Sequence, residues 1–202
     1  AGKAVKSGSG PQSSLSQILW DAGALAKTSR RTAVEATTLA NVAKGIPNPP
    51  LNDSQYEAVK GAARSALSLI WGPPGTGKTD TLAAMVVAMV LEANQLKKPL
   101  KILLTGPNYR AVEELAERTL GLLVTQGGAA CDFYRAYSKS RELPPAPKLP
   151  HHIVGANVSL RQGTPAYGQL QASLLSAARV TLVATSAHAS RKVAELADPG
   201  SV

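Results

Sequence analysis

Residues 72–79 read Gly72-Pro73-Pro74-Gly75-Thr76-Gly77-Lys78-Thr79, and this stretch decides the fold. It matches the phosphate-binding pattern G-x-x-x-x-G-K-[S/T] at every position. Glycine lets the backbone curve around an anion, so that successive N–H groups and the start of a helix face the phosphate. A chance glycine-rich turn after a strand is the alternative. The complete pattern favours a site for a nucleoside triphosphate.

The flanking segments predict that this loop joins a strand to a helix. Residues 67–71 form a short apolar run typical of a buried strand, and residues 79–94 carry apolar side chains at helical spacing without Pro or Gly. Three more strands are expected at residues 100–105, 132–137 and 179–185, with helices between them. This alternation predicts an α/β fold of the P-loop class, in which helices cover both faces of a parallel sheet.

The region before the loop is expected to be helical. Residues 1–12 have a composition typical of disorder, and residues 13–43 predict one long helix or two shorter ones. A proline-rich stretch then ends this segment, so residues 1–50 form a disordered start and a helical accessory segment. A new helix is expected to begin at Asn52, because Gln55 follows three residues later as in a capping box.

The second half contains one segment without a clear pattern. Residues 138–168 include five prolines, which predicts irregular structure or an insertion over residues 138–177. Helices are expected again at residues 169–178 and 189–196. Residues 51–202 are therefore expected to form part of a nucleotide-binding domain, with the insertion inside it.

The net charge of +9 is unevenly distributed. Residues 1–50 hold six Lys or Arg against two acids, residues 51–134 hold eight of each, and residues 135–192 hold eight basic residues against Glu142 alone. Basic segments around a neutral centre favour a polyanionic partner such as nucleic acid, or a protein partner docked on the basic flanks. A solvated basic surface is the alternative.

Cysteine and histidine usage provides no sign of a metal site or a disulfide framework. Cys131 is alone and is expected to fill space in the core, which fits a reducing intracellular setting, cytoplasmic or nuclear. The histidines lack metal-ligand spacing and are expected on the surface or in loops. No apolar run approaches the roughly 18–20 residues of a membrane span, so no membrane partner is expected. The first residues, Ala-Gly-Lys, suggest an excised or processed end.

The phosphate loop assigns chemical roles to two residues. Lys78 is expected to reach the β- and γ-phosphates, and the hydroxyl of Thr79 is expected to bind Mg²⁺, so these two residues are the catalytic candidates. The expected cofactors are therefore a nucleoside triphosphate and Mg²⁺. The full set of expected nucleotide-binding residues is Gln55, Gly72, Pro73, Pro74, Gly75, Thr76, Gly77, Lys78, Thr79 and Asp80.

Four segments together resemble the motifs of superfamily 1 helicases, in the subgroup of the nonsense-mediated-decay helicase and senataxin. Residues 51–59 (LNDSQYEAV) resemble the Q-motif, residues 72–79 motif I, residues 104–115 (LTGPNYRAVEEL) motif Ia and residues 178–188 (ARVTLVATSAH) motif Ic. Asn108 lies one place earlier than in the usual form of motif Ia. The resemblance implies a RecA-like domain that drives movement on single-stranded DNA or RNA.

The resemblance also implies roles for individual residues. Gln55 would read the adenine edge with its amide, although the same side chain could simply cap a helix. Hydroxyls and helix N-termini after the strands would hold the phosphate backbone of a single strand, with arginine as electrostatic support. These residues could otherwise be caps and turn residues. They are Thr105, Pro107, Asn108, Arg110, Thr185 and Ser186.

Some expected parts of such a motor have no counterpart in the sequence. No strand-like run ends in Asp-Glu, and the 202 residues are expected not to include a second motor domain. The resemblance therefore implies the N-terminal part of a first motor domain, which alone would hydrolyse ATP at or near background. Asp80, Glu113 and Glu114 are the remaining acidic candidates. An AAA+-type ATPase and a non-hydrolysing nucleotide-dependent binding module are the alternatives.

Overall fold

Helices and strands alternate along most of the chain in the computed structural model, which describes residues 31–138, 148–161 and 163–197. The described elements are α3 (Ala33–Gly45), α4 (Asp53–Arg64), α5 (Lys78–Gln95), β1 (Leu100–Gly106), α6 (Tyr109–Thr125), β2 (Cys131–Tyr137), β3 (Ile153–Ser159), α7 (Pro165–Leu175), β4 (Val180–Ser186) and α8 (Ala187–Ala197). The predicted strands at residues 100–105, 132–137 and 179–185 are confirmed as β1, β2 and β4. The helix predicted after the phosphate loop is confirmed as α5.

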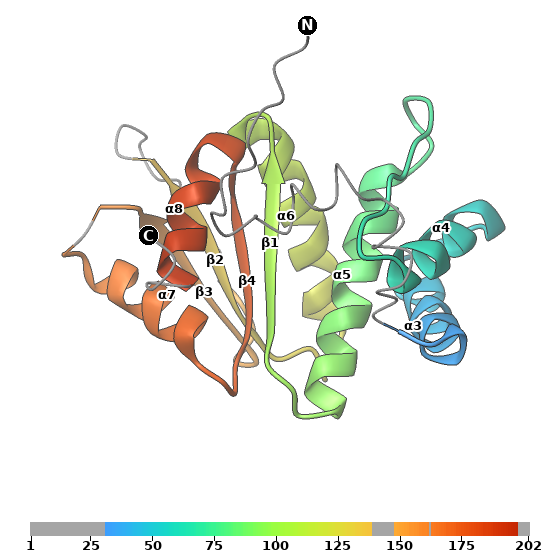
Figure 1. Cartoon of the computed structure of the whole chain (residues 1–202), viewed down its shortest axis with the longest axis horizontal. Helices are drawn as coiled ribbons and strands as arrows, with labels where there is room; N and C mark the ends of the chain where they lie inside the picture. The colour runs from blue at the N-terminus through green and yellow to red at the C-terminus, as the bar shows by residue number, and fades with distance from the viewer. Residues whose placement is uncertain (1–30, 139–147, 162, 198–202) are drawn as a thin grey trace, which may run out of the picture.

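The strands form one parallel sheet in the order β1-β4-β2-β3 (Figure 1). Along the β1–β4 ladder, Leu100 lies opposite Val180 and Gly106 lies opposite Ser186. Parallel strands need crossover helices, and these lie on both faces of the sheet. The predicted α/β fold with a doubly covered parallel sheet is therefore confirmed.

Each face of the sheet has its own apolar core because successive strand residues point to opposite sides. In β4, Leu182 and Ala184 pack in the core under α5 and α6, whereas Val183 packs in the core under α7 and α8. In β2, Phe133 and Tyr134 divide in the same way. These buried layers hold the beginnings of α5 and α6 at the same edge of the sheet.

A third apolar cluster joins α3 and α4 to the side of α5 that faces away from the sheet. Leu39 and Val59 are buried there against Ala84 and Ala88 of α5. Helix α3 ends at Gly45, as the following prolines predict, and α4 begins after the cap residue Asn52. The helical segment before the loop is thus confirmed for residues 33–45. The predicted disorder at residues 1–12, and the helix over residues 13–30, lie outside the described residues.

The strand predicted at residues 67–71 is not formed, and that prediction is wrong. Leu67, Leu69 and Trp71 are 61%, 92% and 85% exposed. A strand is stabilised by a hydrogen-bonded neighbour, and within the described residues β1 pairs only with β4. The apolar run therefore approaches the phosphate loop as an irregular segment that pairs with no described strand.

The irregular structure predicted at residues 138–168 is wrong for residues 153–159, which form a strand, and for residues 165–168, which begin a helix. Strand β3 runs parallel to β2, with Cys131 opposite Ile153 and Tyr137 opposite Ser159. The sequence of β3 contains Gly155 and Asn157 and lacks strict alternation, so its β-propensity is weak. The helix predicted at residues 169–178 begins earlier, at Pro165 after the cap residue Thr164. Residues 139–147 and 162 lie outside the described residues. The division into residues 1–50 and 51–202, and the insertion at residues 138–177, stay predictions.

A polar cluster connects α7 to the sheet at the end of the strands opposite to the phosphate loop. The hydroxyl of Ser173 donates to Asp132 Oδ2 at 2.7 Å, and the Arg179 guanidinium donates to the same oxygen at 2.8 Å. Lys101 Nζ donates to Thr181 Oγ1 at 3.0 Å and to the Ser173 carbonyl at 2.5 Å. Asp132 and Ser173 are both buried, so these bonds satisfy polar groups that burial would otherwise destabilise.

Cys131 is a core residue, as its isolation in the sequence predicts. The thiol is free and buried, and burial raises its pKa to about 12, so it stays protonated as a core residue. His151 and His188 are exposed and His152 is half-buried. None of the described helices has both the length and the apolar character needed to cross a membrane.

We predict that Leu123→Ala in α6 destabilises the fold by about 2–5 kcal/mol, since Leu123 is fully buried between α6 and the sheet. Leu175→Ala in α7 is the matched control because Leu175 is 51% exposed, and it is expected to cost less than about 1 kcal/mol. Chemical denaturation measures both values. Equal costs would contradict the packing described for α6.

Candidate nucleotide-binding site

The phosphate loop has the backbone shape that an anion cradle requires. Gly75 and Gly77 have φ angles of 80° and 73°, the left-handed region that glycine adopts without strain. Gly77 is the N-cap of α5 and provides no side-chain hydrogen bond to the helix. The first N–H groups of α5 therefore keep the capacity to bind an anion, and the helix dipole favours negative charge at that point.

Lys78 folds back over its own loop. Its ammonium group donates to the carbonyl oxygens of Gly72 and Pro73, both at 2.7 Å. Thr76 also closes the loop, because its hydroxyl donates to the Pro73 carbonyl at 2.9 Å, while Pro74 and Gly75 are exposed. The positive charge thus lies directly at the cradle, where a phosphate group could replace the carbonyl oxygens as its partner.

Gln55 links helix α4 to the phosphate loop. Its Oε1 accepts from the backbone N–H of Asn52 at 2.9 Å, and its Nε2 donates to the Thr76 carbonyl at 3.1 Å. The helix-capping role considered from the sequence is therefore present. An amide has two donor hydrogens and two acceptor lone pairs, so one of each remains for a base edge. The adenine-reading role stays a prediction that this geometry allows.

The same amide lies close enough to Gly77 to disfavour a side chain there. A Cβ atom on Gly77 would lie 2.5 Å from Gln55 Nε2, closer than real Cβ contacts allow. The positive φ at Gly77 adds a second constraint. The loop and the Q-motif side chain therefore depend on each other for their positions.

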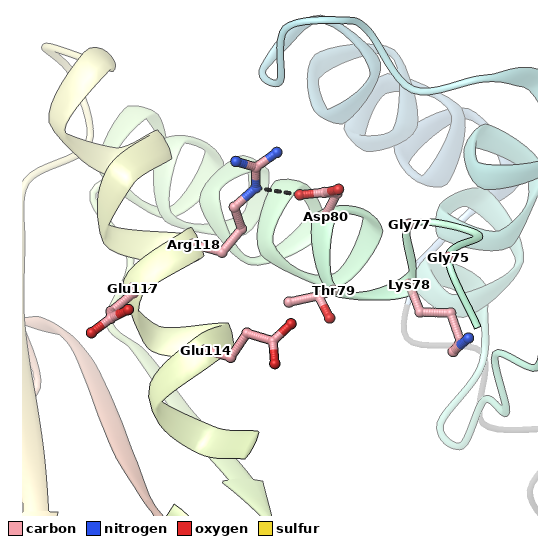
Figure 2. Close-up of a pocket in the computed structure, with 8 residues that line it drawn as sticks. All are labelled: Gly75, Gly77, Lys78, Thr79, Asp80, Glu114, Glu117 and Arg118. Carbon is pink, nitrogen blue, oxygen red and sulfur yellow. Dashed lines mark hydrogen bonds and ion pairs between the residues drawn. The ribbon is translucent and has the colours of Figure 1, made fainter. Parts of the chain in front are cut away.

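A cavity of about 650 Å³ opens between the phosphate loop and helix α6. Its residues come from two segments that are far apart in the sequence, the start of α5 and the middle of α6 (Figure 2). They are Gly75, Gly77, Lys78, Thr79, Asp80, Glu114, Glu117 and Arg118. This places five of the predicted nucleotide-binding residues around one space.

Helix α6 adds Glu117 and Arg118, which lie outside the motifs, and Glu114, one of the remaining acidic candidates. Arg118 Nε donates to Asp80 Oδ1 in an ion pair across the cavity. Figure 2 shows the Glu114 carboxylate directed toward Thr79, whereas Glu117 points away from it. Positions 114 and 118 lie four residues apart and so share one helix face, which is the only sequence signal for this arrangement.

The residues present fit a triphosphate and its metal ion. The uncapped start of α5, the two left-handed glycines and the Lys78 ammonium together form a complementary site for phosphate oxygens. Within residues 31–138, 148–161 and 163–197, no group of three or more His, Cys, Asp or Glu could hold a metal by itself. Mg²⁺ commonly binds to phosphate oxygens and only one or two protein groups, so the Thr79 hydroxyl is a suitable ligand.

The predicted nucleic-acid contacts divide into exposed and buried residues. The ends of the two motif strands lie side by side, since Thr105 pairs with Thr185 along the β1–β4 ladder. Thr105, Pro107, Asn108 and Arg110 are exposed at this edge of the sheet, and Asn108 also caps α6 by accepting from the Ala111 N–H at 2.9 Å. These four could contact a ligand directly.

Thr185 and Ser186 lie beneath the surface. Thr185 is fully buried, and its hydroxyl donates to the Ala136 carbonyl at 2.8 Å. Ser186 is 5% exposed. A contact between either side chain and a nucleic-acid strand would require this edge to open, so the contacts proposed below rest on the exposed residues.

Comparisons with known proteins agree with this geometry. A protein-family model described as an AAA domain matches residues 50–155, which contain the Q-motif, the phosphate loop and motif Ia. The chain is 44% identical over 75 residues to the ATP-dependent helicase upf1 of Schizosaccharomyces pombe. It is 40% identical over 106 residues to the regulator of nonsense transcripts 1 homolog of Arabidopsis thaliana, and 41% identical over 111 residues to the DNA-binding protein SMUBP-2 of Mus musculus.

These alignments cover 36%, 51% and 54% of the chain, but only 8%, 7% and 10% of the three relatives. The chain thus spans a small part of the length of the proteins it matches. No solved structure matches it significantly. The family match extends over half of the chain, and the relatives agree with the resemblance that the four motifs carry. The chain therefore belongs to the AAA-domain family, as a helicase-type member related to the nonsense-mediated-decay helicases.

Proposed function

We propose that this chain is the ATP-binding part of a nucleic-acid-dependent helicase of superfamily 1, with a RecA-like fold. The geometry of the phosphate loop carries the proposal. Gly75 and Gly77 have left-handed backbones, and the start of α5 has no side-chain cap. The Lys78 ammonium group lies against the same loop. Such a site is complementary to a chain of phosphates. The chain is also similar in sequence to an ATP-dependent helicase and to a regulator of nonsense transcripts 1 homolog. This similarity supports a helicase motor rather than an AAA+-type ATPase or a non-hydrolysing binding module.

The proposed ligand is ATP with Mg²⁺. Lys78 and the loop N–H groups would hold the β- and γ-phosphates, Thr79 would hold the metal, and Gln55 would face the adenine. The triphosphate supplies the bond whose hydrolysis releases energy, and Mg²⁺ neutralises charge on its oxygens. The protein residues contribute position and charge. Gln55 adds a connection between the base and the loop, because its amide already donates to the Thr76 carbonyl.

The proposed nucleic-acid partner is a single strand of DNA or RNA at the edge formed by the ends of β1 and β4. Thr105, Asn108 and Arg110 are exposed there, beside the start of α6. Hydroxyl groups, helix N–H groups and a guanidinium group are suited to phosphates rather than to base edges. Binding would therefore show little sequence preference. The basic segments of the chain would add electrostatic attraction, or would bind a protein partner.

Unwinding and translocation are proposed for the whole protein, and the 202-residue chain by itself is expected to hydrolyse ATP at or near background. None of the four described strands is followed by an acidic residue that could orient water for attack on the γ-phosphate. Glu114 is the described carboxylate directed toward Thr79, so Glu114→Gln is the variant to examine if turnover is found.

We predict that the chain binds ATP–Mg²⁺ with a dissociation constant weaker than about 10 μM, and that Lys78→Ala abolishes this binding. The lysine lies at the phosphate cradle, and alanine removes its charge. Isothermal titration calorimetry measures both affinities. Lys60→Ala is the control, because Lys60 forms a surface ion pair on α4 with Glu57. Undiminished binding by Lys78→Ala would refute the assignment of the loop.

We predict that Gln55→Ala reduces the preference for ATP over GTP, because the amide is complementary to the adenine edge and not equally to guanine. Asn52→Ala separates this role from helix capping: it removes the cap of the same helix, at a cost of about 1 kcal/mol in stability, but keeps the Gln55 amide. Competition titrations measure the ratio of affinities. Equal binding of ATP and GTP by the unmodified chain would leave Gln55 with its structural role alone.

We predict that single-stranded nucleic acid binds with an affinity that falls as salt concentration rises, since phosphate contacts release counterions. Arg110→Glu should weaken binding, because it reverses a charge at the exposed edge. Lys98→Glu is the matched charge reversal beyond the opposite end of α5, and it should have a smaller effect. Fluorescence anisotropy with a labelled oligonucleotide measures both. A flat salt response would instead favour a protein partner on the basic flanks.

A further inference from the structure

We propose that Arg118 is a positioning residue that sets the nucleotide affinity of the phosphate loop by neutralising Asp80. This inference rests on the proposed nucleotide site and concerns a residue outside all four motifs. Arg118 lies on α6, forty residues after Lys78, and reaches the start of α5 across the cavity (Figure 2).

Asp80 places a negative charge directly beside the anion cradle. It is the third residue of α5, and its Oδ2 lies 3.8 Å from the position that a Cβ atom on Gly77 would take. A carboxylate in the first turn is favourable for a free helix because it interacts with the helix dipole. It repels a phosphate group that binds at the same helix N-terminus. The loop therefore contains an internal competitor for its ligand.

Arg118 reduces the repulsion between the Asp80 carboxylate and a bound phosphate. Its Nε donates to Asp80 Oδ1, the other oxygen of the same carboxylate. The Arg118 and Asp80 side chains are 48% and 38% exposed, so the pair is partly screened by water but remains fixed in direct contact. A guanidinium group stays charged at any working pH, which makes the neutralisation permanent.

The charges around the cavity show why this contact matters. Lys78 and Arg118 are positive, whereas Asp80, Glu114 and Glu117 are negative, so the lining residues sum to −1. Removal of the Arg118 charge would change this sum to −2 without touching the loop. An incoming triphosphate is strongly negative, and its affinity should respond to each charge that lines the cavity.

The experiment is a double-mutant cycle at Arg118 and Asp80. Calorimetry with ATP–Mg²⁺, and separately with inorganic triphosphate, compares the unmodified chain with Arg118→Gln, Arg118→Lys, Asp80→Asn and the double variant Asp80→Asn with Arg118→Gln. Arg191→Gln is the matched control, because it breaks an exposed arginine–glutamate pair on α8. Circular dichroism and thermal unfolding monitor the fold of each variant.

Arg118→Gln should weaken binding of both ligands about fivefold, the upper range for a partly exposed ion pair. Arg118→Lys should stay within about twofold of the unmodified chain, since it keeps the charge. The double variant should recover to within about twofold, because the uncompensated carboxylate is gone. The loss in Arg118→Gln should also shrink at high salt, which a purely structural defect would not do.

Three results would overturn the inference. Unchanged affinity in Arg118→Gln would show that the ion pair does not influence the loop. A double variant as weak as Arg118→Gln would show that Arg118 acts on the phosphates directly and not through Asp80. A folded, unmodified chain that binds neither ATP nor triphosphate would refute the proposed function itself, and this outcome is distinct from the other two.

Discussion

The structure depends on one constraint, the open N-terminus of α5. A helix start normally receives a side-chain cap, and α3, α4, α6 and α7 each have one. At α5 the cap position is Gly77, which has no side chain to accept from the helix N–H groups, so these groups are left for a ligand. This arrangement requires a left-handed backbone at Gly77, and a Cβ atom there would displace the Gln55 amide. The surrounding structure must therefore hold the loop in place by other means.

Two kinds of contact supply that support. Helix α5 is buried on two sides, against the sheet and α6 in one core and against α3 and α4 in another, so its beginning cannot shift freely. Gln55 then bonds α4 to the loop through the Thr76 carbonyl. The polar cluster around Asp132 stabilises the opposite end of the sheet, far from the loop, so the two ends have separate roles. The loop edge keeps its charged groups accessible, whereas the other end uses its charged groups to attach α7.

Sequence patterns predicted the elements whose signals are local. The strand β4 contains Val180, Leu182 and Val183 between a helix end and a helix start, and it forms as expected. The capping box at Asn52 and Gln55 forms because both partners lie within one turn. Two segments differ from prediction because their state depends on distant neighbours. Residues 67–71 have strand-forming side chains but no ladder partner among the described residues, while β3 has weak propensity and forms beside β2.

The residues of the candidate site also divide into those that the sequence predicts and those that only the structure brings to the site. The sequence by itself determined where the phosphate loop lies, because an anion cradle is built from consecutive backbone groups. It also predicted the roles proposed for Lys78 and Thr79 and the connection of Gln55 to that site. Only the tertiary structure brought Glu114 and Arg118 to the loop, and only it buried Thr185 and Ser186. The physical reason is that charge pairing and burial depend on which helix faces pack together. The contacting residues are far apart in the chain, 38 residues for Asp80 and Arg118 and 49 residues for Ala136 and Thr185, and no local pattern specifies such contacts.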